Sequence, residues 1–267
     1  MPTDGAPPPI LRAKHPDAPS QFTAEGLLRE ARRQKEVPAG AVPPVCLLDP
    51  DGDVVRALRA AGRTTPDPHW ACYHSELDRF ALGDRTCGVV GCAVGAPYAV
   101  LVAEQLFASG CRLVVSVTSA GQLAAVQPPP YHVLIERALR DEGTSYHYMP
   151  ASEASAVDPS LAELSAGALT DLDPPVLRGT SWTTDAPFRE TQAAIDAATA
   201  EGALAVEMEA AGLYAFARAT GNPVVCFAHV TNQMAQVEGD FEKGEGDGTT
   251  ATLTLLERIV SAWFAAS

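Results

Sequence analysis

The sequence predicts a three-layer α/β/α fold in which helices cover both faces of a central, largely parallel mixed sheet. Short β-rich runs, several of them apolar at almost every position, alternate along the chain with amphipathic helical segments. A strand that is apolar throughout is buried on both faces, which is typical of a sheet between two layers of helices. Hydrophobic residues make up 46% of the 267 positions, enough to form the core that such a fold needs.

The N-terminal part is expected to be a flexible arm followed by one domain. Residues 1–20 are rich in proline and polar groups, and no repeat or low-complexity linker divides residues 21–267. The first helix is expected at about 23–35, where Thr23 can cap its start and Pro38 ends it.

Strands and helices then follow in alternation. Strands are expected at 45–48, 87–94, 112–118, 131–135, 176–180 and 223–230. Between the second and third strands lies a helix with Pro97 in its first turn and Gly110 at its C-terminal cap. Another helix is expected at about 204–219, ending near Gly221. The last, at about 249–266, has an apolar stripe formed by Leu253, Leu255, Leu256, Ile259, Val260 and Trp263.

Charge and composition exclude several classes of partner. A formal net charge of −14 would repel nucleic acid and anionic lipid, and no apolar run is long enough to span a bilayer. The N-terminus has no apolar signal-peptide core. The six cysteines form no C-x-x-C pair, so we expect free thiols in a cytoplasmic protein. No metal or cofactor site is predicted.

Two polar segments follow predicted strands, where α/β folds gather their ligands. In the first, Thr118 to Gln122, Ser119 and Gly121 form a small turn that can hold a sugar or an anion near the backbone, although this composition is also ordinary in turns. In the second, Trp182 to Thr191, Arg189 is placed to contact a base, or else forms a surface ion pair.

Two glutamates stand at the predicted start of an apolar helix. Glu207 and Glu209 would point about 200° apart on a helix, so we expect one to face solvent and the other to be buried. A buried carboxylate is costly without a partner, and a ribose diol would supply two hydroxyl donors. Its charge would also stabilise the oxocarbenium-like transition state of glycosidic bond cleavage. The alternative is a pair of surface glutamates near a helix N-terminus.

These segments resemble the nucleoside phosphorylase superfamily, on the side of uridine phosphorylase and the adenosine-type nucleosidases. The resemblance covers roughly residues 44–265, and its most specific stretch is Val-Glu-Met-Glu-Ala-Ala at 206–211, with the Ser-Ala-Gly turn upstream. Segments 140–148 and 182–191 are similar to those of bacterial and archaeal members. The resemblance implies a nucleoside phosphorylase-like fold and cleavage of the N-ribosidic bond of a nucleoside. It also implies a homo-oligomer built from dimers that lend side chains across an interface.

The resemblance also implies roles for individual residues. Met208 and Glu209 match the ribose-binding pair, and Ser119 matches the hydroxyl that touches phosphate or ribose. Arg189 matches an arginine that contacts the pyrimidine, and Phe188 is expected to wall the base pocket.

The first turn departs from the phosphorylase pattern. Phosphorylases of the family hold phosphate with a Gly-Asp-Pro turn and two arginines, whereas residues 47–53 here read Leu-Leu-Asp-Pro-Asp-Gly-Asp and Ser116 replaces the second arginine. Phosphate would bind poorly beside three aspartates. We therefore expect hydrolysis, with Asp53 as general base and Asp51 as the next candidate; phosphorolysis, with phosphate as co-substrate, stays the alternative.

The last predicted strand bears on the leaving base. After His229 the chain reads Val-Thr-Asn232-Gln233, with no acid that could protonate a purine as in adenine-type members. Asn232 and Gln233 can donate hydrogen bonds, which favours a uracil-like or 6-oxopurine base. Segment 238–247 is interpreted as a solvated loop or a lid. A non-catalytic nucleoside-binding or regulatory protein stays open, whereas a Rossmann-type oxidoreductase is disfavoured because the G-x-G-x-x-G spacing is missing.

Overall fold

The computed structural model describes residues 7–234 and 238–266, so residues 1–6 of the predicted arm lie outside the described residues. The strands are β1 (Val45–Asp49), β2 (Thr64–Pro66), β3 (Asp78–Leu82), β4 (Arg85–Gly91), β5 (Leu113–Gln122), β6 (Tyr131–Asp141), β7 (Ala154–Ala156), β8 (Leu177–Thr184), β9 (Ala203–Glu207) and β10 (Val224–Asn232). The α-helices are α1 (Ala24–Lys35), α2 (Asp53–Ala60), α3 (Ala96–Ala108), α4 (Pro159–Ala168), α5 (Gln192–Ala200), α6 (Ala210–Thr220) and α7 (Thr249–Ala266). Short 3-10 turns are η1 (Pro9–Leu11), η2 (Ser145–His147) and η3 (Pro187–Arg189).

The strands of the described residues form one mixed sheet. Their order is β10-β6-β8-β9-β5-β1-β4-β3-β2, with β7 paired to β6, and β10 pairs with β5 as well. Strands β5, β10, β6, β8 and β9 therefore close into a ring, which the sequence did not predict. The pairs β1–β4, β1–β5, β5–β10, β6–β8 and β8–β9 are parallel, and the others are antiparallel.

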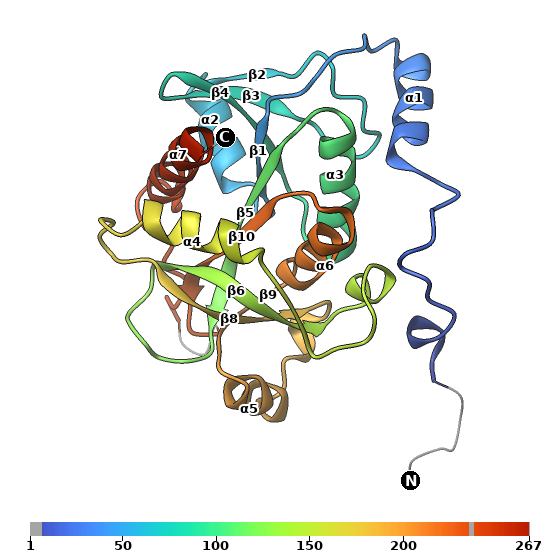
Figure 1. Cartoon of the computed structure of the whole chain (residues 1–267). Coiled ribbons are helices and arrows are strands. Elements are labelled where there is room, and N and C mark those ends of the chain that lie inside the picture. Colours follow the sequence, from blue (N-terminus) through green and yellow to red (C-terminus); the bar gives the residue numbers. More distant parts are fainter. Residues whose placement is uncertain (1–6, 235–237, 267) are drawn as a thin grey trace.

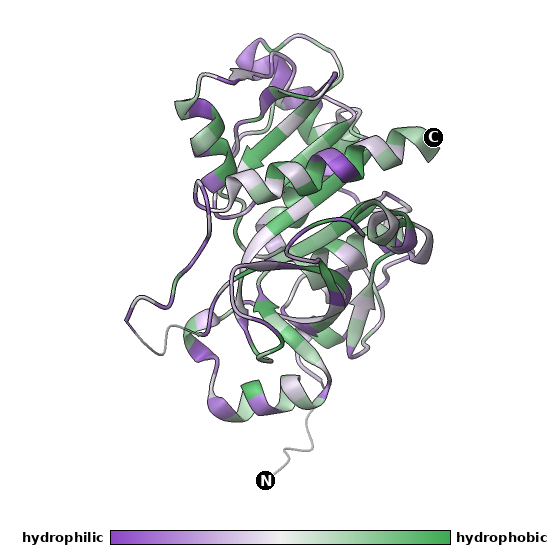
Figure 2. Cartoon of the chain, turned by 90° about the vertical axis from the view of Figure 1, so that its left-hand side faces the viewer, coloured by the Kyte–Doolittle hydropathy of each residue, from purple (hydrophilic) through white to green (hydrophobic). Residues whose placement is uncertain are grey.

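Helices cover both faces of this sheet, which confirms the predicted fold class. Figure 1 shows α1, α3 and α6 on one side of β1, β5 and β10, and α2, α4 and α7 on the other. Helix α3 packs against α1 and α6, and α7 packs against α2 and α4. Every residue of β1 and β10 is buried. In Figure 2 the central strands are largely green, that is hydrophobic, whereas purple, hydrophilic residues lie mostly in loops and on helices. None of the described helices is long and apolar enough to cross a membrane.

Local sequence signals predicted the ends of several helices correctly. Thr23 caps α1 by accepting a hydrogen bond from the backbone N–H of Gly26 at 3.1 Å. Pro97 lies in the first turn of α3, and Gly110 follows that helix with φ +98°, a conformation that favours glycine. The last helix was also predicted with the right bounds.

The helix predicted at 204–219 was wrong in its first turn. Residues 203–207 form strand β9, and the helix begins only at Ala210. Alanine and glutamate favour helices, but β9 pairs with both β5 and β8, and these tertiary pairings override local propensity. Helix α2 was not predicted, so Asp53 lies in the first turn of a helix rather than in a loop.

Candidate active site

The polar residues predicted to act on substrate lie at the carboxyl ends of neighbouring strands. The turn after β1 leads through Asp51 and Gly52 directly into α2. Gly52 has φ +77°, and an added Cβ would lie 2.7 Å from both Arg56 and Cys92, so the turn is tightly packed. Because β1 is parallel to β5, this turn lies beside the C-terminal half of β5 at the same edge of the sheet. The turn predicted at 118–122 was wrong: pairing with β10 and β9 extends β5 to Gln122, so Ser119 and Gly121 lie in the strand.

Glu209 is the buried carboxyl group at the centre of this edge. It is the N-cap residue of α6, is 1% exposed, and accepts a hydrogen bond from the backbone N–H of Gly95 at 2.7 Å. Burial raises its pKa to about 8, and the charges of Glu207 and Asp51 act in the same direction, against hydrogen bonds from Gly95 and Thr118. A carboxyl group with so little access to water is stabilised by each hydrogen-bond donor that a ligand brings to it.

Glu207 does not face solvent, so the prediction that one of the two glutamates would do so was wrong. It ends β9, is 3% exposed, and accepts hydrogen bonds from the hydroxyls of Ser181 at 2.9 Å and Thr183 at 2.5 Å. Its other oxygen accepts from the backbone N–H groups of Glu209 and Ala210, each at 2.7 Å. Both glutamates are buried because one ends a strand and the other starts a helix, which makes the helical 200° separation inapplicable.

Asp51 brings a carboxylate to Ser119 in the C-terminal half of β5. Its Oδ2 accepts a hydrogen bond from the backbone N–H of Ser119 at 2.7 Å, across 68 positions of sequence. Its Oδ1 makes no hydrogen bond within the described residues. The backbone N–H of Ser119, whose hydroxyl the resemblance assigns to phosphate or ribose, is therefore already bound to a carboxylate of this chain.

Asp53, the first-choice general base, is held in two ion pairs. Its Oδ1 lies 2.6 Å from Arg56 Nη2, and its Oδ2 lies 2.5 Å from Lys243 Nζ. Burial acts to raise the pKa of Asp53, but the hydrogen bonds and charges of Lys243 and Arg56 outweigh it and lower the pKa below its ordinary value. With both oxygens in ion pairs and a lowered pKa, Asp53 is poorly placed to accept a proton from water.

The deeper carboxyl group of this turn is Asp49. It is 3% exposed and accepts a hydrogen bond from the backbone N–H of Val55 at 2.9 Å. Burial raises its pKa to about 6; the hydrogen bond from Val55 opposes this rise, whereas the charges of Asp51 and Asp53 add to it. The turn therefore concentrates three carboxyl groups in a small volume.

The C-terminal end of β10 lines another side of the candidate site. Asn232 is buried and accepts a hydrogen bond from the backbone N–H of Met234 at 2.9 Å, while its amide nitrogen lies 3.5 Å from the carbonyl of Ala120. A Cβ added to Gly121 would lie 2.5 Å from the sulfur of Met234. The Gln233 side chain is exposed, so only Asn232 of this predicted pair is buried at the strand end.

The two histidines near this side of the site stack on each other. His229 and His132 have ring centroids 4.5 Å apart and nearly parallel planes. Burial lowers the pKa of His229 to about 4 and that of His132 to about 3, so both rings are neutral near pH 7. His229 is therefore a poor proton donor for a leaving base.

Phe188 and Arg189 are not brought to Glu209 in the single chain. Phe188 is 98% exposed on η3, so it walls no pocket of this chain. Arg189 is exposed as well, and its side chain makes no hydrogen bond or ion pair with any residue that the structure describes. Met208 is half-buried, and its backbone N–H lies 3.3 Å from Glu209 Oε2, next to the candidate site.

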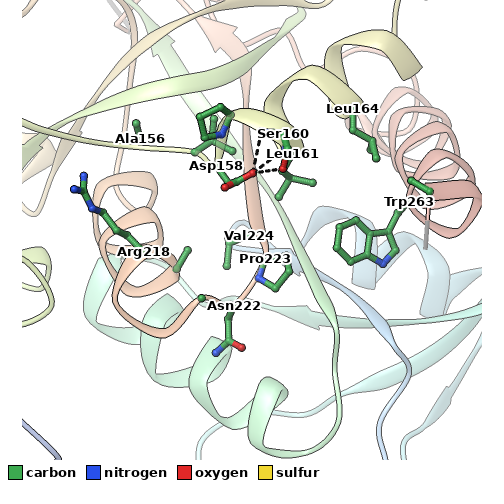
Figure 3. Close-up of a pocket in the computed structure, with 15 residues that line it drawn as sticks. Ala156, Asp158, Ser160, Leu161, Leu164, Arg218, Asn222, Pro223, Val224 and Trp263 are labelled. Carbon is green, nitrogen blue, oxygen red and sulfur yellow. Dashed lines mark hydrogen bonds between the residues drawn. The ribbon is translucent and has the colours of Figure 1, made fainter. Parts of the chain in front are cut away.

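A large cavity of about 830 Å³ lies elsewhere. It is lined by Asn222, Pro223 and Val224 at the amino end of β10, and by Trp263 and Arg218 on opposite sides (Figure 3). Its carboxylate, Asp158, serves as the N-cap of α4 and is bonded to the N–H groups of Ser160 and Leu161. Because this cavity lies at the other end of β10 from Asn232, it is not the candidate active site.

Sequence reasoning missed two contributors to the site. Gly95 supplies the backbone donor to Glu209, and Lys243 supplies a cation from a segment remote in sequence. The one available signal was that Lys243 is the single lysine in the acidic segment 238–247. In the part of the chain that the structure describes, no group of three or more His, Cys, Asp or Glu side chains is placed to hold a metal ion. Five cysteines are buried and free, and Cys92 is free and exposed.

Comparison with known proteins gives one family. Residues 33–261 match the family model described as the phosphorylase superfamily. A guanosine phosphorylase from Halorubrum lacusprofundi is 31% identical over 129 residues, which cover 48% of this chain and 53% of that protein. The chain thus spans about half the length of this curated relative.

Solved structures share the fold. A uridine phosphorylase from Vibrio fischeri has a TM-score of 0.69 at 20% identity, covering 83% of this chain and 93% of its own. A purine nucleoside phosphorylase from Toxoplasma gondii, in complex with immucillin-H, has a TM-score of 0.68 at 14% identity and covers 83% and 92%. A methylthioadenosine/S-adenosyl homocysteine nucleosidase from Campylobacter jejuni has a TM-score of 0.66 at 14% identity and covers 82% and 99%.

Proposed function

This chain belongs to the phosphorylase superfamily, and on that premise we propose that it cleaves the N-ribosidic bond of a nucleoside at the edge formed by Glu209, Asp51 and Ser119. The observation that carries the proposal is Glu209, a carboxyl group 1% exposed that accepts hydrogen bonds from the backbone N–H of Gly95 at 2.7 Å, from that of Met208 at 3.3 Å and from Thr118, and still has lone pairs to offer. Two ribose hydroxyls would provide the donors that its remaining lone pairs lack.

Hydrolysis is the reaction that the charges of the site favour. Asp51 accepts a proton from water through its unbonded Oδ1, the water oxygen bonds to the anomeric carbon, and the bond from that carbon to the base nitrogen breaks with its electron pair on the base. Glu209, ionised when it binds the diol, stabilises the positive charge that develops on the ribose ring. We assign the base role to Asp51, the second candidate from sequence, because both oxygens of Asp53 are in ion pairs.

The leaving base is proposed to be uracil-like or a 6-oxopurine. Asn232 is the buried amide at the end of β10, and its side chain can reorient to donate to a carbonyl or to a ring nitrogen that gains charge. The neutral, stacked His229 does not supply a proton. A base that leaves as a stabilised anion is compatible with these groups.

Phosphorolysis is the second candidate. The guanosine phosphorylase relative favours it, and so do the two cations Arg56 and Lys243, which pair with Asp53 after β1. Phosphate would have to displace the Asp51 carboxylate from the backbone N–H of Ser119 and lie close to two aspartates. That cost is why hydrolysis is placed first.

The test is release of free base from uridine, inosine, guanosine and adenosine, with and without phosphate. We expect base and free ribose without phosphate. Ribose 1-phosphate, formed only when phosphate is present, would establish phosphorolysis instead. A folded protein that binds nucleosides in a thermal-shift assay but releases no base would favour the non-catalytic alternative, and one that neither binds nor cleaves any nucleoside would refute the proposal.

Matched variants of the two aspartates test the assignment of the base. Asp51→Asn should lower kcat by about 100-fold or more, because it removes the proton acceptor. Asp53→Asn removes a carboxylate of the same turn that is already neutralised by two cations, so its effect on kcat should be smaller. The reverse order of effects would return the base role to Asp53.

A further inference from the structure

The segment of residues 240–248 is fixed against the carboxyl end of β10. The Asp240 carboxylate accepts the backbone N–H of Gln233 at 2.9 and 3.0 Å, and the backbone N–H of Glu242 donates to the carbonyl of Thr231 at 2.7 Å. Gly248, with φ +79°, approaches His229 so closely that a Cβ would lie 2.2 Å from the imidazole ring. These contacts at both ends of the segment position the lysine between them.

Lys243 places the ammonium group of this segment beside the carboxylates of the proposed active site. Its Nζ lies 2.5 Å from Asp53 Oδ2 across 190 positions of sequence, and only 28% of its side chain is exposed. The hydrogen bond and charge of Asp53 raise the pKa of Lys243 against the effect of burial, so the ammonium stays charged. The other charged or titratable groups that face this pair are Asp49, Asp51 and Arg56 around the β1–α2 turn, Cys92 after β4, His229 on β10 and Asp247 on its own segment.

Lys243 and Arg56 both pair with Asp53, but they differ in their other partners and in their exposure to solvent. Arg56 donates to the Asp53 carboxylate at 2.6 Å and to the backbone carbonyl of Asp51 at 2.9 Å, and its side chain is 59% exposed. Lys243 is less exposed, so its interaction with the carboxylates is less screened by water. It is also the one that links the turn after β1 to the segment after β10.

We propose that Lys243 is a positioning residue of the reaction: its ammonium pairs with Asp53, places a positive charge near Asp51, and holds segment 240–248 against the edge at which the nucleoside is proposed to bind. This inference rests on the proposed function. Without Lys243, only the more exposed Arg56 would offset the repulsion among Asp49, Asp51 and Asp53, and protonation of a carboxylate would relieve that repulsion at the expense of the general base. An arginine at 243 would preserve the charge, whereas methionine would preserve only the length of the side chain.

The test is the pH profile of kcat/KM for Lys243→Met and Lys243→Arg, with Lys14→Met as a control. Lys14 lies on the N-terminal part of the chain, 3.1 Å from His147. In Lys243→Met the acid limb of kcat/KM should move up by about 1 pH unit, a loss of about tenfold on that limb, with little loss near pH 8. KM should also rise, because the segment loses its tether. Lys243→Arg should keep the limb within a few tenths of a unit, and Lys14→Met should match the wild type.

A Lys243→Met profile that superimposes on the wild-type profile would overturn the inference while leaving nucleoside cleavage intact. A loss that is equal at all pH values, and that arginine does not rescue, would indicate a merely structural role and would also overturn it. If the wild type releases no base at all, the proposed function fails independently of this inference. The effect of Lys243 on the Asp53 carboxylate is then measured by ¹³C NMR titration of the Asp53 carboxyl, whose signal is assigned with Asp53→Asn. That carboxyl should titrate at higher pH in Lys243→Met; an unmoved titration would refute it.

Discussion

At the scale of single residues, Glu209 shows a conflict between stability and function. Its carboxyl group is 1% exposed beside a second buried carboxyl group, so ionisation is unfavourable in the folded state. Its pKa is about 8 in the folded protein against an ordinary value of 4.5. Between these two pH values the folded chain retains a proton that the unfolded chain has released, and the free energy of unfolding therefore falls as pH rises.

Glu209→Gln should remove this penalty and abolish catalysis together. The amide can still accept the backbone N–H of Gly95, so we expect the free energy of unfolding to rise by about 1–2 kcal/mol at pH 8 relative to wild type. Near pH 4, where both states carry the proton, the difference should vanish. Urea unfolding at the two pH values measures this. A difference between variant and wild type that does not grow with pH would show that Glu209 is not held protonated.

At the scale of secondary-structure elements, the Glu207 side chain connects β9, β8 and α6 through hydrogen bonds. It ends β9, accepts two hydroxyl donors from β8, and accepts the first backbone N–H groups of α6. The Thr183 hydroxyl in turn accepts the backbone N–H of Ala211 at 3.0 Å. The junction that presents Glu209 to the site is therefore held by four donors to one carboxylate.

Glu207→Gln should loosen this junction. The amide oxygen can keep the two backbone N–H donors, but the hydroxyls of Ser181 and Thr183 would have to reverse and accept from the amide nitrogen, and all four hydrogen bonds would lose the charge of the carboxylate. We expect a cost of about 2–3 kcal/mol in the free energy of unfolding. Urea denaturation near pH 7 measures the loss. Glu201→Gln, at an exposed position that precedes the same strand, serves as a control and should change stability by less than about 0.5 kcal/mol. Equal stability of Glu207→Gln and Glu201→Gln would contradict the assigned role.

At the scale of the whole molecule, one chain leaves part of the predicted site exposed. Phe188 is 98% exposed and Arg189 beside it has no side-chain partner among the described residues. An apolar ring this exposed is typical of a surface that a second subunit covers. We therefore keep the prediction of a homo-oligomer built from dimers.

Sedimentation equilibrium should give a mass of at least twice the 28.0 kDa of the chain. Phe188→Asp should shift the protein toward the monomer, because it places a charge in an apolar contact, whereas Phe188→Leu should leave assembly largely intact. A monomer of 28.0 kDa across the micromolar range would show the prediction of a homo-oligomer to be wrong.

The sequence by itself determined the elements whose signals are local. The cap at Thr23, Pro97 in the first turn of α3 and the apolar strands β1 and β10 were readable because each depends on residues within a turn or on burial of a whole strand. Local composition marked Ser119 as a candidate, whereas Glu209 was distinguished from Glu207 only by the resemblance to the family. The local pattern failed at 203–207, where pairing with two strands outweighed helix propensity.

Only the tertiary structure decided which groups meet. Asp51 meets Ser119 across 68 positions, Glu209 meets Gly95 across 114, and Lys243 meets Asp53 across 190. Such contacts depend on strand order and on where each loop returns to the sheet edge, and no local pattern encodes either. The sequence could therefore name the candidate carboxylates, but the ion pairs of Asp53 and the complete burial of both glutamates followed from the fold.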